Sequence, residues 1–217
     1  MASASLASAE PWSAPDARMI FNAPAGWAVQ RVPVENRVYV VAQTDTKQCH
    51  LMTMSRPATQ DAAPRAVREA GAQPLAPAVW ERLPPALPRV FGPESHLVST
   101  TIDTAGAWPI QFGRYESPTR IVHAAVQFRP GQEFWSFCYA ASEVAGDAGA
   151  FATLQRSVAS TDDAQLQAAI DAEYGAAEAQ SAQRELDQLA YDQRRLRSAG
   201  ITSPDPGNNS NQISGDP

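Results

Sequence analysis

Short stretches rich in Val, Ile, Tyr, Phe and Thr recur along the chain between polar turns, a pattern that favours β-strands over helices. The pattern begins at residues 18–32, where apolar residues flank a Pro-x-Gly turn. Further strands are predicted over 36–44, 49–57, 96–103, 108–116, 120–128 and from residue 132 onward. No stretch repeats another, so the chain is not a repeat protein.

The last two strands form a hairpin closed by Pro130-Gly131, which fits a type II turn. If Arg129 pairs with Gln132, one face of the hairpin is wholly apolar, and the other places His123 opposite Cys138. A slip of one residue would invert both faces. Both faces carry apolar residues, which predicts a central position in the sheet. The apolar pairs are Val126 with Trp135, Ala124 with Phe137 and Val122 with Tyr139.

Helical patterns lie in the Pro-rich segment 58–93 and after the last strand. In the Pro-rich segment, which is an insert between the strands, PRAVREAGA and PAVWERL each predict a short helix. The second begins near Pro77 and ends at Pro84. Near residue 150, Phe151, Leu154 and Val158 share one helical stripe. Strands, a helical insert, three more strands and helices together predict an α+β fold with an antiparallel sheet flanked by helices.

A second, longer helix is predicted from Asp162 to about Arg197, with Asp162 and Gln165 in a capping-box arrangement. Acidic residues crowd its first half and arginines its end, which complements the helix dipole. Its apolar stripe is thin, and Gly175 and Ser181 interrupt the phase, which argues against a sustained heptad coiled coil. The predicted organisation is a flexible arm (1–17), an α+β domain (18–160), the long helix (161–198) and a disordered tail (199–217).

Apolar residues make up 44 % of the chain, which is enough for a core, and the net charge is −6. That charge argues against nucleic acid as a partner. No window approaches 18 consecutive apolar residues, so no direct membrane span is predicted. The segment Ala7-Ser8-Ala9 resembles the end of a signal-peptide cleavage site. We therefore expect an exported, periplasmic protein, with a disordered cytosolic N-terminus as the alternative.

The two cysteines, Cys49 and Cys138, each lie within a predicted strand. Three alternatives are open: a disulfide joining non-neighbouring segments, which an exported protein favours; two buried free thiols; or a reactive thiol at Cys138 paired with His123. A nucleophilic thiol needs a base, an exposed cleft and an orienting group, and the residues around Cys138 are aromatic.

Other candidate chemistry is sparse. The histidines His50, His96 and His123 stand alone on strands without zinc-ligand spacing, and the familiar catalytic and nucleotide-binding motifs are missing from the sequence. The alternating Trp135, Phe137 and Tyr139 fit a core strand. We therefore predict no catalytic residues, no cofactor and no metal. Trp12 lies in the arm, and its ring docks either on the domain or on a partner.

The segment FNAPAGW, with Phe21, Pro24, Gly26 and Trp27, resembles the F-x-x-P-x-G-W start of the PsbP-like proteins. The order of elements agrees over residues 18–160 and leaves the long helix outside. The resemblance implies an α/β/α sandwich around an antiparallel sheet. It also implies a non-enzymatic role, because family members are mostly extrinsic subunits of membrane complexes, envelope lipoproteins and binding or assembly factors.

We expect the chain to bind another protein, such as a membrane complex, as an accessory or assembly subunit. The motivation is the long polar helix, which its own domain hardly needs and which is stable only when it packs on something. The rival hypothesis is a small-molecule or lipid-binding domain, or a weak hydrolase, with a pocket between the sheet and the insert 58–93. The predicted partner-binding residues are Trp12, Tyr174, Leu186, Leu189 and Leu196.

Overall fold

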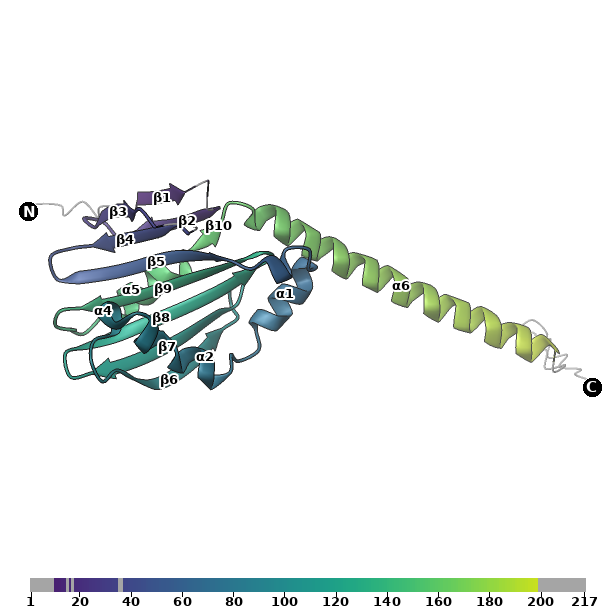
Figure 1. Cartoon of the computed structure of the whole chain (residues 1–217). Coiled ribbons are helices and arrows are strands. Elements are labelled where there is room, and N and C mark those ends of the chain that lie inside the picture. The colour runs from purple at the N-terminus through teal and green to yellow at the C-terminus, as the bar shows by residue number, and fades with distance from the viewer. Residues whose placement is uncertain (1–9, 15, 17, 35–36, 199–217) are drawn as a thin grey trace, which may run out of the picture. The chain divides into compact units, whose positions relative to one another are not determined.

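A seven-stranded antiparallel sheet organises the domain in the computed structural model, which describes residues 10–14, 16, 18–34 and 37–198 (Figure 1). The strand order is β3-β4-β5-β9-β8-β7-β6, with β9 in the middle. The strands are β3 (Ala28–Val32), β4 (Tyr39–Gln43), β5 (Lys47–Ser55), β6 (His96–Asp103), β7 (Ile110–Ser117), β8 (Arg120–Arg129) and β9 (Gln132–Ala140).

The β8–β9 hairpin has the predicted register. Arg129 pairs with Gln132, Val126 with Trp135, and His123 with Cys138. Gly131 has a φ of 73°, which the turn requires and which glycine adopts without strain. The two-residue Pro130-Gly131 turn sets this register, and it places Val126, Trp135 and Phe137 on the insert-covered face.

Helices of the Pro-rich insert cover one face of the sheet (Figure 1). Prolines occupy the first turns of these helices, where the missing N–H costs no helical hydrogen bond. The prediction that Pro84 ends the second helix is wrong, since Pro84 lies inside the next helix, α3 (Leu83–Ala86). Buried Trp80 and Phe91 pack from this layer against Tyr115 and Phe137 of the sheet. The elements are η2 (Pro57–Thr59), α1 (Pro64–Gly71), α2 (Pro77–Glu81), α3 (Leu83–Ala86) and α4 (Pro88–Phe91).

The other face is covered by α5 (Asp147–Arg156) and a small sheet of β1 (Glu10–Ala14), β2 (Met19–Ala23) and β10 (Ala159–Ser160). Phe151 and Leu154 of α5 are buried as the helical stripe predicted. Helices on one face, and a helix with a small sheet on the other, confirm the predicted α+β sandwich.

Strand β1 corrects the predicted flexible arm, because residues 10–14 pair with β2 in antiparallel register. Trp12 sits opposite Phe21, with ring centroids 5.1 Å apart, and is half-buried against the core. The sequence missed the strand because EPWSA has little β-propensity of its own, and only its pairing partner makes it extended. Residues 1–9 of the arm and the predicted tail 199–217 lie outside the described residues.

The long helix α6 (Asp163–Ser198) begins inside the domain. Ile170 is fully buried and packs with Val67 and Trp108, so the first compact unit ends at Asp171 and the second begins at Ala172. The boundary predicted near residue 160 therefore falls too early, because the first turns of α6 belong to the core. The second unit consists of the rest of α6 among the described residues. In that part of the chain, no helix has both the length and the hydropathy of a membrane span.

The start of α6 is anchored by an ion pair to the sheet. Arg129 of β8, whose side chain is 3 % exposed, contacts both carboxylate oxygens of Asp163, with Nε–Oδ1 at 2.5 Å and Nη2–Oδ2 at 2.8 Å. The guanidinium also lies 4.4 Å from the centre of the Trp108 ring. Burial lowers the pKa of Arg129, and the hydrogen bonds and charge of Asp163 offset only part of that shift, so the acidic partner keeps the buried cation tolerable.

Candidate functional site

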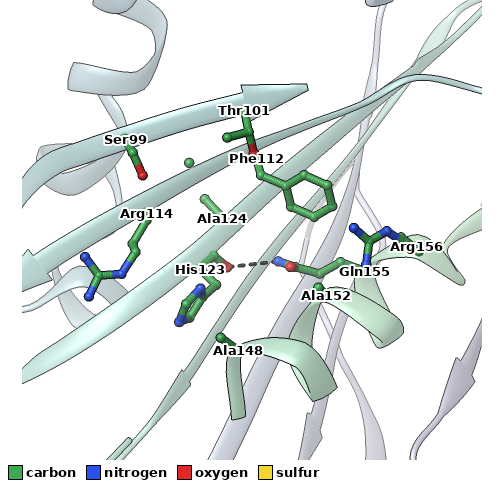
Figure 2. A pocket seen from close by; sticks show the side chains of 11 residues that line it. Ser99, Thr101, Phe112, Arg114, His123, Ala124, Ala148, Ala152, Gln155 and Arg156 are labelled. Atoms are coloured by element: carbon green, nitrogen blue, oxygen red, sulfur yellow. Dashed lines mark hydrogen bonds between the residues drawn. The ribbon is translucent and has the colours of Figure 1, made fainter. Parts of the chain in front are cut away.

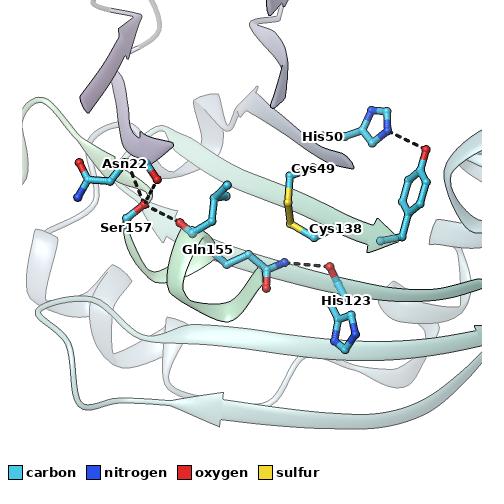
Figure 3. Close-up of a disulfide and its surroundings, with 9 residues drawn as sticks. Asn22, Cys49, His50, His123, Cys138, Gln155 and Ser157 are labelled. Carbon is cyan, nitrogen blue, oxygen red and sulfur yellow. Dashed lines mark hydrogen bonds between the residues drawn. A yellow bond between two sulfur atoms is a disulfide. The ribbon is translucent and has the colours of Figure 1, made fainter. Parts of the chain in front are cut away.

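A disulfide joins Cys49 to Cys138 across the middle of the sheet (Figure 3). The two residues are directly opposite each other on the neighbouring strands β5 and β9, and both are fully buried. Of the three alternatives that the sequence left open, the structure therefore has the disulfide. The expectation that the bridge ties non-neighbouring segments is wrong in space, since the strands are adjacent although 89 residues separate the cysteines.

His123 lies opposite Cys138 in the register, as predicted, but it is engaged elsewhere. Its Nε2 is 3.0 Å from a carboxylate oxygen of Glu143, and its backbone carbonyl accepts a 2.9 Å hydrogen bond from the Gln155 amide. With Cys138 in the disulfide, no thiol is left for this imidazole to activate.

A polar groove of about 260 Å³ lies on the sheet beside α5 (Figure 2). Its basic side chains each have an acidic neighbour. Arg156 donates to Asp103 over 2.7 Å, Arg114 pairs with Glu116, and His123 contacts Glu143. The groove therefore has little net positive charge to offer an anion. The sequence missed it because it forms only when β6, β7, β8 and α5 come together.

A second, mostly apolar cavity of about 330 Å³ lies between α1 and β8, where the rival hypothesis placed a pocket. Val67, Leu75 and Phe128 contribute apolar surface, while Arg56, Thr59 and Arg129 bring polar groups to it. Arg129 is held by Asp163, and Arg56 pairs with buried Glu133. The cavity reaches the size at which small-ligand sites begin, but its arginines already have partners.

A hydrogen-bonded chain of side chains crosses strands β4, β5 and β9 on the insert-covered face. Tyr39 bonds Nδ1 of His50, the Nε2 of His50 lies 3.4 Å from the Tyr139 hydroxyl, and that hydroxyl donates to Gln48. Arg120 lies over the Tyr139 ring, 4.7 Å from its centre. These contacts suit a neutral imidazole that accepts at Nδ1 and donates at Nε2. The sequence hid this network because it requires the pairing of three strands.

Burial, and secondarily the charge of Arg120, lowers the pKa of His50 to about 4. The unfolded chain takes up this proton near pH 6.5, whereas the folded chain does not. Stability contributed by the neutral imidazole is therefore lost as the pH falls from 6.5 towards 4. We expect the free energy of unfolding to drop by about 2 kcal/mol between pH 7 and pH 5 through this group.

Urea unfolding of wild type and His50→Gln at pH 7 and pH 5 measures this loss. The Gln variant should lose about 2 kcal/mol less than wild type over the same interval. His96→Gln, at an exposed strand position, is the matched control and should behave as wild type. An equal pH dependence in all three proteins would contradict a depressed pKa at His50.

The predicted partner-binding side chains of α6 are exposed. The exposed fractions are 59 % for Leu186, 59 % for Leu189 and 50 % for Leu196, while Tyr174 is 41 % exposed. At 3.6 residues per turn, the three leucines lie on one side of the helix. Trp12 differs, because the structure describes it docked on its own domain, the first of its two alternatives.

Comparison with known proteins identifies the fold. No protein-family profile and no curated protein sequence matches the chain. Among solved structures, it is similar to the solution structure of cyanobacterial PsbP (CyanoP) from Synechocystis sp. PCC 6803, with 15 % sequence identity and a TM-score of 0.50. The match covers 74 % of this chain and 96 % of the cyanobacterial one. The chain thus has a PsbP-like fold, which confirms the resemblance seen in FNAPAGW.

Proposed function

We propose that the chain is a non-enzymatic, exported bacterial protein that serves as a binding, assembly or accessory subunit of an envelope or membrane complex. The α+β domain is the platform, and the leucines of α6 are the docking surface. The observation that carries the proposal is the exposure of Leu186, Leu189 and Leu196 along one side of the helix.

Exposed single apolar residues are common, but aligned leucines on one helix side are typical of a protein-binding surface. Burying one leucine side chain is worth roughly 1.5–3 kcal/mol. Burying all three leucines against a partner would contribute several kcal/mol to the free energy of binding, before the cost of association is subtracted. A polar helix gains most of its stability from such packing.

The compartment is supported by the disulfide, since buried disulfides persist mainly in oxidising compartments. The PsbP-like fold is consistent with the accessory role that the family resemblance implies. In a bacterium, the periplasm is the compartment where a protein can both keep a disulfide and serve a membrane complex.

Affinity capture from the native envelope tests the proposal. The full chain should retain the subunits of one membrane complex, identified by mass spectrometry, and the variant L186S/L189S/L196S should lose at least nine-tenths of them. Tyr191→Ser is the matched control, because Tyr191 is 57 % exposed on the opposite side of the helix. Equal retention by the leucine variant, or capture of no envelope subunit, would refute the docking role.

The cavity between α1 and β8 supports a second candidate, the binding of a small apolar or lipid-like molecule. Hydrolysis is less well supported, because the Thr59 hydroxyl in its lining already donates to the Arg56 carbonyl. Val67 lines the cavity, and Val67→Trp would fill part of it. Native mass spectrometry that finds a co-purifying small molecule in wild type, but not in Val67→Trp, would favour this candidate. A wild-type chain without such a molecule would count against it.

A further inference from the structure

We propose that the leucine side of α6 pairs with α6 of a second copy of this chain in antiparallel orientation. The inference rests on the proposed docking role of α6 and names what occupies that surface when no envelope complex is bound. Two properties of the helix specify it independently: the sizes of the side chains along the docking side, and the order of the charges along the helix.

Side-chain size changes abruptly along the docking side. Its first half carries Gly175, Ala179 and Ala182, and its second half carries Leu186, Leu189 and Leu196. All six residues are exposed. A parallel pair in register would set leucine against leucine at one end and leave a gap at the small residues. The distance between two helix axes depends on the side chains in contact, so setting large side chains opposite small ones keeps that distance even and leaves no gap.

An antiparallel pair centred between residues 185 and 186 satisfies this requirement on either side of its centre. Gly175 of one helix then lies opposite Leu196 of the other, and Ala182 lies opposite Leu189. Glu178 meets Gln193, whose amide can donate to the carboxylate. A short pair of helices does not need a long heptad repeat, so the interrupted heptad phase of α6 is compatible with this pairing.

The charges give the same orientation. The first part of the helix carries Asp171, Glu173 and Glu178, and the last turns carry Arg194, Arg195 and Arg197. An antiparallel pair sets the acidic stretch of each helix beside the arginines of the other, whereas a parallel pair sets like charges together. Antiparallel helix dipoles also attract each other.

The size of the contact predicts a modest affinity. The paired segment 173–198 is about 39 Å long at 1.5 Å per residue, and a helix is about 10 Å wide. Such a contact buries on the order of 1,000 Å² from both chains, near the lower limit for specific interfaces. We therefore expect a dimer with a dissociation constant in the micromolar range.

Sedimentation velocity of the full chain between about 1 and 200 µM tests the pairing, a range that brackets a micromolar dissociation constant. Wild type should pass from monomer to dimer, and L186S/L189S should weaken the dimer at least tenfold. Tyr191→Ser should dimerise like wild type, and circular dichroism should show that all variants keep their helix. A wild-type chain that stays monomeric throughout, or that dimerises equally in the leucine variant, would overturn the proposal.

Cysteine cross-linking tests the orientation. Ala182→Cys and Leu189→Cys proteins, mixed under mild oxidation, should form a mixed cross-linked dimer, while each alone should form little. Efficient cross-links of each variant with itself would indicate a parallel pair and overturn the proposal. Reversing the arginines in R194E/R195E/R197E should weaken the dimer at low salt, and 0.5 M salt should weaken the wild-type dimer.

The outcomes separate this inference from the proposed function. A monomeric chain that still captures an envelope complex through its leucines refutes the second copy and leaves the docking role intact. A leucine-dependent dimer that captures no envelope subunit supports the pairing and refutes the accessory role. Loss of both measurements refutes both proposals.

Discussion

Replacing Arg129 by Met is expected to lower the free energy of unfolding by about 3 kcal/mol, because it leaves the carboxylate of Asp163 without its cation in a largely buried site. Loss of one partner of a buried pair typically costs about 3–5 kcal/mol. The lower end applies because Asp163 keeps 22 % of its side chain exposed. Urea unfolding at pH 7 measures the loss, and the midpoint should fall by more than about 1 M.

Arg156→Met is the matched control for this prediction. Arg156 also pairs with an aspartate, through Nε–Oδ2 to Asp103 at 2.7 Å, but its side chain is half exposed, so its loss should cost less than about 1 kcal/mol. The double variant R129M/D163N should recover part of the loss, because it removes the uncompensated charge. Equal effects of the two Arg→Met substitutions would contradict the structural importance of the buried pair.

Removing the disulfide with C49A/C138A is expected to lower the free energy of unfolding by roughly 4 kcal/mol. The bridge closes a loop with a sequence separation of 89, and the loss of that closure releases entropy to the unfolded chain. Urea unfolding of the variant, compared with the oxidised wild type, measures the effect. A difference below about 1 kcal/mol would contradict a stabilising bridge.

The burial of both sulfurs adds a kinetic expectation. Because Cys49 and Cys138 are fully buried, reductant should reach them only when the sheet opens. Thiol labelling of the wild type in dithiothreitol should therefore be slow without denaturant and fast near the urea midpoint. Rapid labelling in native buffer would show that the middle of the sheet opens easily.

The strands were predictable from sequence because their patterns are local. Pairing Arg129 with Gln132 across the Pro130-Gly131 turn predicted a hairpin register that the structure reproduces pair by pair. The insert helices α1 and α2 were also predictable, since Pro64 and Pro77 stand at helix starts. Strand β1 was not predictable, because its extended form depends on pairing with β2 rather than on its own residues.

The candidate sites divide in the same manner. The leucines of α6 could be predicted from helical periodicity alone, since no tertiary contact is needed to place them on one side. The Tyr39–His50–Tyr139 network and the groove beside α5 could not, because each combines residues from several strands. The disulfide was predictable only in part. The two cysteines could be assigned to strands from the sequence, but the register that sets them opposite each other could not.

The most direct test of the whole account is the free energy of unfolding of L186S/L189S/L196S in the full chain at about 1 µM, below the expected dimer affinity. If these leucines serve a partner rather than the core, the variant should unfold within about 1 kcal/mol of wild type, as exposed substitutions do. Leu154→Ser, at a buried position of α5, should lose several kcal/mol under the same conditions. A comparable loss in the α6 variant would mean that the three leucines stabilise the fold itself, and the docking surface would not exist.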